Sequence, residues 1–214
     1  VMSGDTPTGT PTDTGVVSGF TKSGLAPATD YEFYVQADCT GGDTSVWVGP
    51  FAFTTACDIF TPDYVADMSV NVPNCWEEAN SGDATTGPMD LGAGLWYGSN
   101  HNGTPSNAIN LWTDTRSDWI ISPEFDLSSA APSELNIYVA LTENSTNGSG
   151  ADLGSDDSVD LLMTTDGGTT WTSMQTWTQG NVPTDIGEQI TYDLSAISGT
   201  VQFAFLGDEG DVDD

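Results

Sequence analysis

Cationic side chains are almost absent from this sequence. Lys22 and Arg116 are its only lysine and arginine among 214 residues, against 32 aspartates and glutamates, and the formal net charge is −30. Such a chain repels phosphate groups, which argues against nucleic acid and anionic membrane surfaces as partners. Two compatible explanations of the acidity stay open: adaptation to salty water, where ions screen the self-repulsion, and binding of divalent cations by carboxylates.

Long apolar runs are also missing. No stretch approaches the roughly 18 consecutive apolar residues that a membrane-spanning helix needs, so we expect no membrane insertion. The sequence begins abruptly at Val1 and ends in GDEGDVDD. These ends are typical of a piece of a longer protein, so the lack of a signal peptide says little about export.

Catalytic motifs are missing too. His101, the one histidine, lies in the loop-like stretch GSNHNGTPSN, with neither a Gly-x-Ser-x-Gly nor a His-Glu-x-x-His pattern in the chain. A solvated loop histidine is the simpler interpretation. Counting alone never excludes a carboxylate pair for glycoside hydrolysis. Glutamates are nevertheless scarce, and none sits at a recognisable strand end beside aromatic residues, so we predict a chain that is not an enzyme.

Aromatic and turn-forming residues dominate what is present. Seven Trp, eight Phe and six Tyr are spread among Gly, Thr, Ser and Asp, a composition typical of strands and turns. Strands are predicted at VVSGFT, YEFYVQADC and VWVGPFAFTT, and then, after a Gly-rich stretch reaching about Thr104, at AINLW, DWIISPEFDL, SELNIYVAL, SVDLLMTT, TWTSMQTW, QITYDLSAI and TVQFAFLG. The stretch TTDGGTTW predicts a hairpin. No helical period exceeds two turns, so the prediction is an all-β antiparallel sandwich.

The cysteine count is odd, with Cys39, Cys57 and Cys75. Cys57 and Cys75 flank a short loop-like segment, and we expect a disulfide bond between them, which requires an oxidising compartment. Cys39 belongs to a different sequence unit and is expected to be free or paired outside this chain.

Residues 17–55 resemble the last strands of a fibronectin type III domain. The specific stretches are SGLAPATDYEFYVQADC, similar to the tyrosine corner of that family, and the closing GPFAFTT. In such a corner the hydroxyl of Tyr31 would bond the backbone upstream. The resemblance implies a partial fibronectin-type-III-like domain over residues 1–56, without its first strands.

Residues 57–214 resemble the MAM-like jelly-roll modules of secreted Bacteroidetes surface proteins, also called cleaved-adhesin or choice-of-anchor modules. The stretches that agree, in order, are CW at Cys75, DWIISPEFDLS, SVDLLMTTDGGTTW and ISGTVQFAFLGDEG. The family's closing strand continues past an Asp-Asp pair, whereas this chain stops at Asp213 and Asp214. The resemblance therefore implies a jelly roll over residues 57–214 that lacks its last strand, or one completed by a neighbour.

Calcium is the predicted cofactor, because it takes six to eight oxygen ligands and this chain offers many. No stretch has EF-hand spacing, so separate segments must supply the ligands. The family resemblance points to Asp67 together with Asp211, Asp213 and Asp214. A second candidate cluster is Asp156 and Asp157 in GSDDS. For each of these residues, a solvated turn aspartate is the alternative.

The tryptophans divide into core candidates and contact candidates. Trp76, Trp112 and Trp119 fall in or beside predicted strands and are expected in the core. Trp177 lies nearer a loop. Trp96 and Tyr97, in GLWYGSNHNG, are the predicted contact with a glycan or protein, since amphipathic aromatics suit interfaces.

The resulting hypothesis is a non-catalytic, secreted or cell-surface module for adhesion or surface display in a large multi-domain protein, stabilised by calcium. Its partners would be a glycan or protein on another surface and neighbouring modules. Two alternatives stay open: an accessory carbohydrate-binding module of a secreted hydrolase or protease, and a structural repeat of an extracellular filament.

Overall fold

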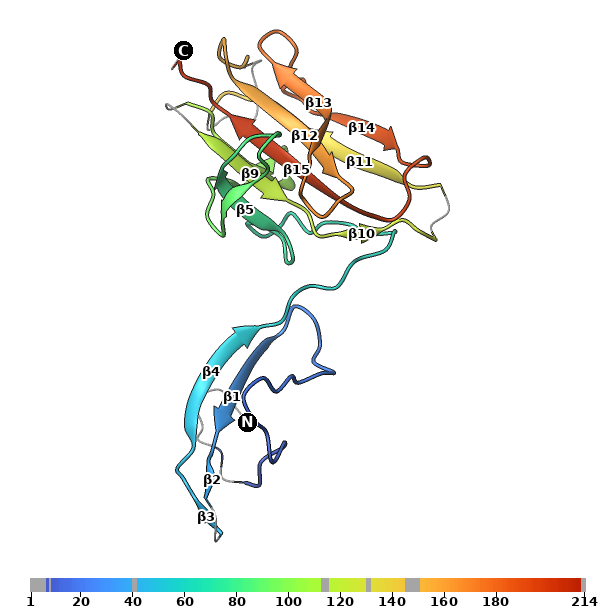
Figure 1. Ribbon diagram of the computed structural model, residues 1–214. Coiled ribbons are helices and arrows are strands. Elements are labelled where there is room, and N and C mark those ends of the chain that lie inside the picture. Colours follow the sequence, from blue (N-terminus) through green and yellow to red (C-terminus); the bar gives the residue numbers. More distant parts are fainter. Residues whose placement is uncertain are drawn as a thin grey trace. The chain divides into compact units, whose positions relative to one another are not determined.

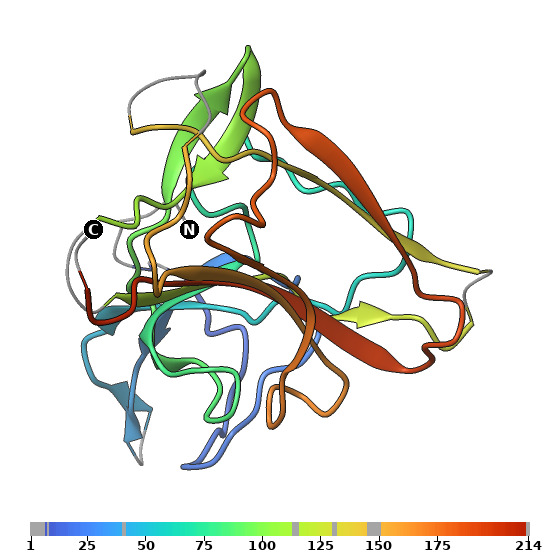
Figure 2. The same cartoon turned by 90° about the horizontal axis from the view of Figure 1, so that it is seen from above.

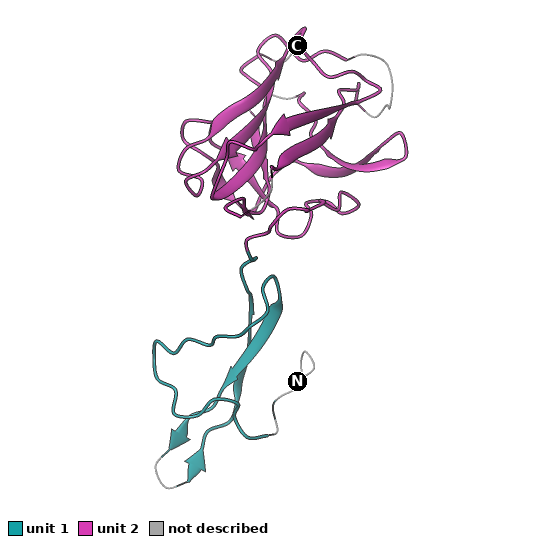
Figure 3. Ribbon diagram, turned by 90° about the vertical axis from the view of Figure 1, so that its right-hand side faces the viewer, with its two compact units in different colours: residues 1–58 teal, residues 59–214 magenta. Residues whose placement is uncertain are grey.

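The computed structural model describes residue 7 and residues 9–39, 42–112, 116–129, 132–144 and 151–212. It divides into two compact units, residues 1–58 and residues 59–214 (Figure 3), whereas the sequence prediction placed the boundary after residue 56. Every regular element in the described ranges is a β-strand, and the strands pair antiparallel in several sheets. The predicted all-β antiparallel class is confirmed.

Unit 1 is built on two short hairpins. Its strands are β1 (Asp30–Val35), β2 (Asp38–Cys39), β3 (Asp43–Thr44) and β4 (Val48–Thr54), with β1 paired to β4 and β2 to β3. Tyr31 lies opposite Phe53, and Phe33 opposite Phe51, with ring centroids 5.8 and 5.1 Å apart. The hydroxyl of Tyr31 accepts a hydrogen bond from the backbone N–H of Ala26, at 2.8 Å. This upstream bond of Tyr31 was predicted and is confirmed.

The strand predicted at VVSGFT, residues 16–21, is wrong. The backbone turns there, with Phe20 N donating to Val17 O at 3.1 Å. Gly19 has φ 89°, a conformation that glycine adopts freely and that an extended strand does not contain. The Ser-Gly pair therefore decided the local structure, and the valines before it stay outside any sheet.

The aromatic face of the β1–β4 hairpin is open. Phe33, Phe51 and Phe53 are 41–48% exposed, and no residue that the structure describes in unit 1 is buried. Within the described residues, then, this unit has no closed hydrophobic core of its own.

Unit 2 contains one large sheet and smaller pairs (Figure 1). The large sheet has seven strands in the order β13-β12-β15-β9-β5-β6, with β10 paired to β15; β11 pairs with β14, and β7 with β8. The strands are β5 (Glu77–Ser81), β6 (Met89–Leu91), β7 (Tyr97–His101), β8 (Thr104–Ala108), β9 (Ser117–Ile121), β10 (Phe125–Asp126), β11 (Glu134–Val139), β12 (Ser158–Thr164), β13 (Thr172–Thr178), β14 (Glu188–Asp193) and β15 (Thr200–Asp208).

The large sheet buries side chains on both of its faces. One face carries a cluster made of Ala79, Trp119, Ile121, Leu162, Trp171, Ala204 and Leu206. The other face, with Leu161, Trp177 and Phe205, packs against Leu135, Ile137, Ile190 and Tyr192 of the β11–β14 pair. Figure 2 shows these strands as two layers. Residues 118–122 are all buried, because this strand is covered on both of its faces. The apolar residues Trp119, Ile120 and Ile121 therefore follow one another without the alternation of a half-exposed strand.

The predicted hairpin at TTDGGTTW joins β12 to β13. Gly167 and Gly168 have φ values of 71° and 84°, as a tight turn requires. The carboxylate of Asp166 accepts hydrogen bonds from the backbone N–H groups of Thr169 and Thr170. These donors, with the hydroxyl groups of Thr170 and Thr164, lower the pKa of Asp166 to about 2.

Two other predictions along unit 2 are corrected by the structure. The Gly-rich stretch before Thr104 contains the strands β5, β6 and β7, which the sequence did not suggest, and AINLW is not a strand beyond Ala108. Trp112, expected in the core, is 65% exposed, while Trp177, expected near a loop, is 5% exposed. Trp177 lies in β13 and points into the sandwich, whereas Trp112 follows the end of β8 and lies in no sheet.

The burial of Trp119 predicts a large loss of stability on truncation. Trp119→Ala should lower the free energy of unfolding by about 3–5 kcal/mol, because the side chain is fully buried and its removal leaves a cavity. Trp112→Ala, the same change at an exposed site, should alter it by no more than about 0.5 kcal/mol. Urea unfolding followed by far-UV circular dichroism measures both, and equal losses would contradict this core assignment.

Candidate functional site

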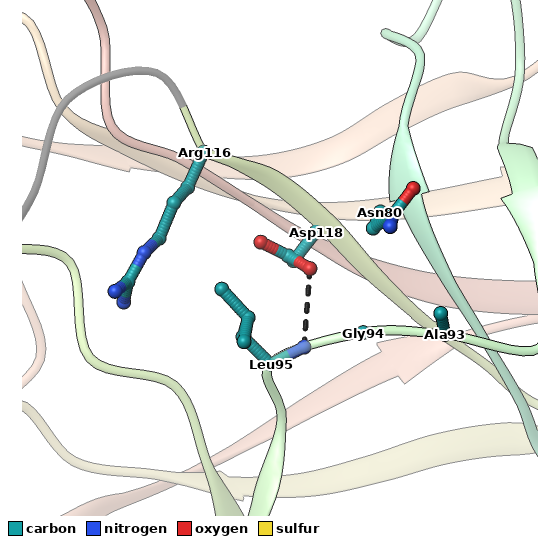
Figure 4. Close-up of a pocket in the computed structure, with 6 residues that line it drawn as sticks. All are labelled: Asn80, Ala93, Gly94, Leu95, Arg116 and Asp118. Carbon is teal, nitrogen blue, oxygen red and sulfur yellow. Dashed lines mark hydrogen bonds between the residues drawn. The ribbon is translucent and has the colours of Figure 1, made fainter.

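A cavity of about 380 Å³ opens beside strands β5 and β9 (Figure 4). Two side chains from those strands, Asn80 and Asp118, contribute polar atoms, and Arg116 enters from the residue before β9. The remaining wall is the segment 93–95, which leads into β7 and supplies Ala93, Gly94 and Leu95. The lining thus combines a cation, a carboxylate, an amide and an apolar surface.

Asp118 is the buried polar residue of this site. Its side chain is 2% exposed, and its Oδ1 accepts a hydrogen bond from the backbone N–H of Leu95 at 3.1 Å. Trp96 Nε1 also donates to the backbone carbonyl of Asp118, at 3.2 Å. Burial raises the pKa of the Asp118 carboxyl, against the opposing effects of the Leu95 N–H and the positive charge of Arg116. The carboxylate therefore ties the segment 93–95 to the sheet.

Glu78 lies on the same face of the neighbouring strand. It is paired in register with Ile120, two residues along β9 from Asp118, so both carboxyl groups point to one side of the sheet. Burial raises the pKa of Glu78; the Trp96 backbone N–H lowers it, and the nearby charge of Asp118 raises it. Oε1 of Glu78 is buried and makes no hydrogen bond to any described residue.

Gly94 allows the covering segment to approach these carboxyl groups. A Cβ atom at this position would lie 2.7 Å from Glu78 Oε1 and 2.8 Å from Glu78 Cβ, closer than side-chain atoms pack. Any larger residue would push the segment away from the sheet. The glycine is thus a condition of the contacts that Leu95 and Trp96 make.

Arg116 is held at the other side of the cavity. Its Nε lies 3.7 Å from Oε2 of Glu209, which is 2% exposed, and its Nη1 donates to the carbonyl of Asn110. The backbones of Arg116 and Glu209 are also bonded, with Glu209 N donating to Arg116 O at 3.0 Å. The one arginine of this acidic chain therefore sits among buried acids, where its charge offsets theirs.

The predicted calcium ligands fall at several places. Asp67 is exposed, and its Oδ1 accepts from Ser69 N at 3.0 Å. Asp156, predicted in a separate cluster from Asp211, is brought to it: Asp156 Oδ2 accepts from Asp211 N at 2.7 Å and from Val212 N at 3.2 Å. Asp157 is 7% exposed, with Oδ2 accepting from Gly154 N.

Asp213 and Asp214 lie outside the described residues. Over the ranges that the structure does describe, no three side chains of the metal-binding types come close enough together to hold an ion. The structure thus joins one predicted pair of segments, at residues 156 and 211, without forming a complete ligand set.

The predicted contact pair Trp96 and Tyr97 point in different directions. Trp96 is half-buried, with its ring 6.3 Å from that of Phe205, whereas Tyr97 is 43% exposed. Tyr97 begins β7, whereas Trp96 precedes that strand and its ring is held by the hydrogen bond from Nε1 to the backbone carbonyl of Asp118. Only Tyr97 is exposed as an interface aromatic would be.

His101 is not a freely solvated loop residue. Its Nε2 lies 2.8 Å from the backbone carbonyl of Asp185, which identifies Nε2 as the protonated nitrogen, and its ring centroid is 6.2 Å from that of Tyr138. The histidine therefore attaches the tip of the β7–β8 hairpin to the segment before β14.

Cys57 and Cys75 are both disulfide-bonded, and Cys39 is a free, exposed thiol. The described ranges contain no helix long and apolar enough to cross a membrane. In comparisons with known proteins, no family model, curated protein or solved structure matches this chain.

The cavity residues were missed by sequence reasoning. Asp118 carried a usable signal, because it begins the apolar run DWII and an acid inside a buried strand needs a partner. Leu95 and Glu78 carried none, because their contact with Asp118 depends on the pairing of segments distant in the sequence.

The raised pKa of Glu78 predicts a pH-dependent stability difference. A carboxyl group whose pKa is higher in the folded than in the unfolded chain stabilises the fold less as it loses its proton. Stability therefore falls as pH rises from the ordinary value of 4.5 through the raised folded value. We expect Glu78→Gln to be more stable than wild type at neutral pH and to lose this advantage below about pH 4.

Thermal melting at constant ionic strength across this pH range measures the difference. Glu77→Gln, at the exposed first residue of the same strand, controls for the removal of one negative charge from a very acidic chain. A Glu78→Gln advantage that did not change with pH would show that burial does not shift this group.

Proposed function

We propose that this chain is a non-catalytic adhesion or surface-display module of a large, multi-domain extracellular protein. The observation that carries the proposal is a chain of two β units in tandem whose Cys57 and Cys75 are disulfide-bonded. Disulfide bonds persist in oxidising environments such as the cell exterior. β modules in series suit a protein that displays loops and sheet faces at a distance from its anchor.

The charge of the chain supports the same proposal. A net charge of −30 keeps the molecule soluble and separated from like-charged neighbours, and salt water screens the self-repulsion over distances beyond roughly 8 Å. Exposed aromatics, among them Tyr97 and Tyr138, supply amphipathic contact points on unit 2.

Adhesion is tested with beads that carry the folded chain. We expect such beads to be retained under flow on surfaces coated with mixed glycans or extracellular proteins, and to be released from uncoated surfaces. Beads carrying an unrelated protein of similar net charge serve as the control. Equal retention of both kinds of beads, or none, would count against an adhesive function.

Calcium binding is a second part of the proposal, centred on Asp156 and the segment that begins at Asp211. Asp156 already holds this segment through two N–H groups, and carboxylate and carbonyl oxygens are the ligands that calcium prefers. A ligand that binds only the folded chain raises its stability by mass action.

We therefore expect a higher melting temperature in excess calcium than in chelator, at matched ionic strength. Asp156→Asn should abolish this shift, while Asp58→Asn, at an exposed residue of unit 1, should retain it. The same shift with magnesium, or a shift that survives in Asp156→Asn, would argue for screening of charge rather than a site.

A further inference from the structure

We infer that the cavity lined by Asn80, Arg116 and Asp118 binds a neutral saccharide unit. It has about 380 Å³ of space, and its walls combine buried and exposed polar groups with the apolar side chains of Ala93 and Leu95. Small-molecule sites of roughly 300–1,000 Å³ share this composition of an apolar wall and a few fixed polar groups. The inference deepens the proposed adhesive function, because it names a ligand class and a place for it.

The polar groups of the cavity match the hydroxyl groups of a sugar. A sugar hydroxyl both donates and accepts hydrogen bonds. Asp118 offers a carboxylate oxygen as acceptor, and its Oδ1 is already fixed by the backbone N–H of Leu95. The side chains of Asn80 and Arg116, which carry N–H donors, lie on either side of Asp118 (Figure 4). Adjacent hydroxyls of one ring can therefore bond to a donor and an acceptor together.

Other ligand classes fit the charge of the cavity less well. The positive charge of Arg116 is already offset by Glu209, at 3.7 Å, and Asp118 and Glu78 add negative charge nearby, so an anion would be repelled. A divalent cation would have to displace or tolerate the guanidinium. The carboxylate of an amino acid would compete with Glu209 for the same arginine. A neutral ligand with many hydroxyl groups avoids each of these costs.

Rigid positioning of Asp118 makes it suitable for selective binding. The segment 93–95 is held by Leu95 N–H on Asp118, and Gly94 permits the close approach to Glu78. Because both walls are tied to the same sheet, little rearrangement is required when a ligand enters. A buried carboxylate that pairs with a hydroxyl also rejects analogues that lack that hydroxyl.

The test uses the whole 214-residue chain and ligand-detected saturation-transfer NMR. The probes are D-glucose, D-galactose, D-mannose and N-acetyl-D-glucosamine at millimolar concentration, with glycine, glutamate and calcium chloride as alternatives. We expect at least one sugar to bind. Asn80→Ala should weaken its binding by about tenfold, the loss expected for one or two hydrogen bonds. Ala93→Phe should abolish binding, because the larger ring fills the cavity at an exposed position.

Asp118→Asn should weaken binding by tenfold or more. Asn80→Ala and Ala93→Phe keep the test decisive if this buried substitution impairs folding. Asp58→Asn makes the same chemical change at an exposed residue of unit 1 and should bind as wild type does. Unchanged melting temperatures for Asn80→Ala and Ala93→Phe would show that loss of binding is local.

Three results would overturn the inference: no sugar binds, binding is unaffected by Asn80→Ala and Ala93→Phe, or an amino acid or calcium occupies the cavity in place of a sugar. Failure here is separable from failure of the adhesive function. An absence of sugar binding in the NMR test would refute the cavity assignment even if beads of the wild-type chain adhere. Failure of wild-type beads to adhere would refute adhesion even if the cavity binds a sugar.

Discussion

Burial of both faces of the seven-stranded sheet is the constraint on which unit 2 depends. Strand β15 lies between β12 and β9, and its successive residues Phe205 and Leu206 pack into different clusters on opposite faces. A sheet covered on both sides leaves little place for charge within its central strands. Each acid that the sequence does put there must then be supplied with hydrogen bonds or an opposite charge.

The cavity follows from that requirement. Asp118 begins the buried run of β9, and its carboxylate is accommodated only because the segment 93–95 turns a backbone N–H toward it. Glu78, on the adjacent strand, makes the region still more acidic, and Arg116 with Glu209 places the one arginine beside it. The Leu95 N–H and the positive charge of Arg116 therefore line the cavity as the groups that compensate the buried acid. The cavity thus lies at the part of the sheet where polar rather than apolar side chains face the covering segment.

Much of the fold was accessible from sequence because strand signals are local. Alternating aromatics predicted β1 and β4, the Asp-Gly-Gly turn predicted the β12–β13 hairpin, and Tyr31 predicted its own bond to the backbone at Ala26. Strands such as EEANS and TPSNA were missed, because their residues have weak β propensity and their pairing is decided by tertiary neighbours. Trp112 and Trp177 were misassigned for the same reason: nearness to a loop does not decide which face of which strand a ring occupies.

A comparison of the two units explains why the candidate site was harder to predict from the sequence than the fold. Phe33 in β1 and Ile137 in β11 follow the same alternation, yet Phe33 is 48% exposed whereas Ile137 packs against the large sheet. Periodicity identifies the face that needs a cover, but the cover is a second layer formed by segments that are distant in the sequence. The cavity depends on such a cover at atomic detail, because a Cβ at position 94 would already lie 2.7 Å from Glu78 Oε1. Contacts of that kind are set by the joint placement of three segments, and no single stretch of the chain encodes them.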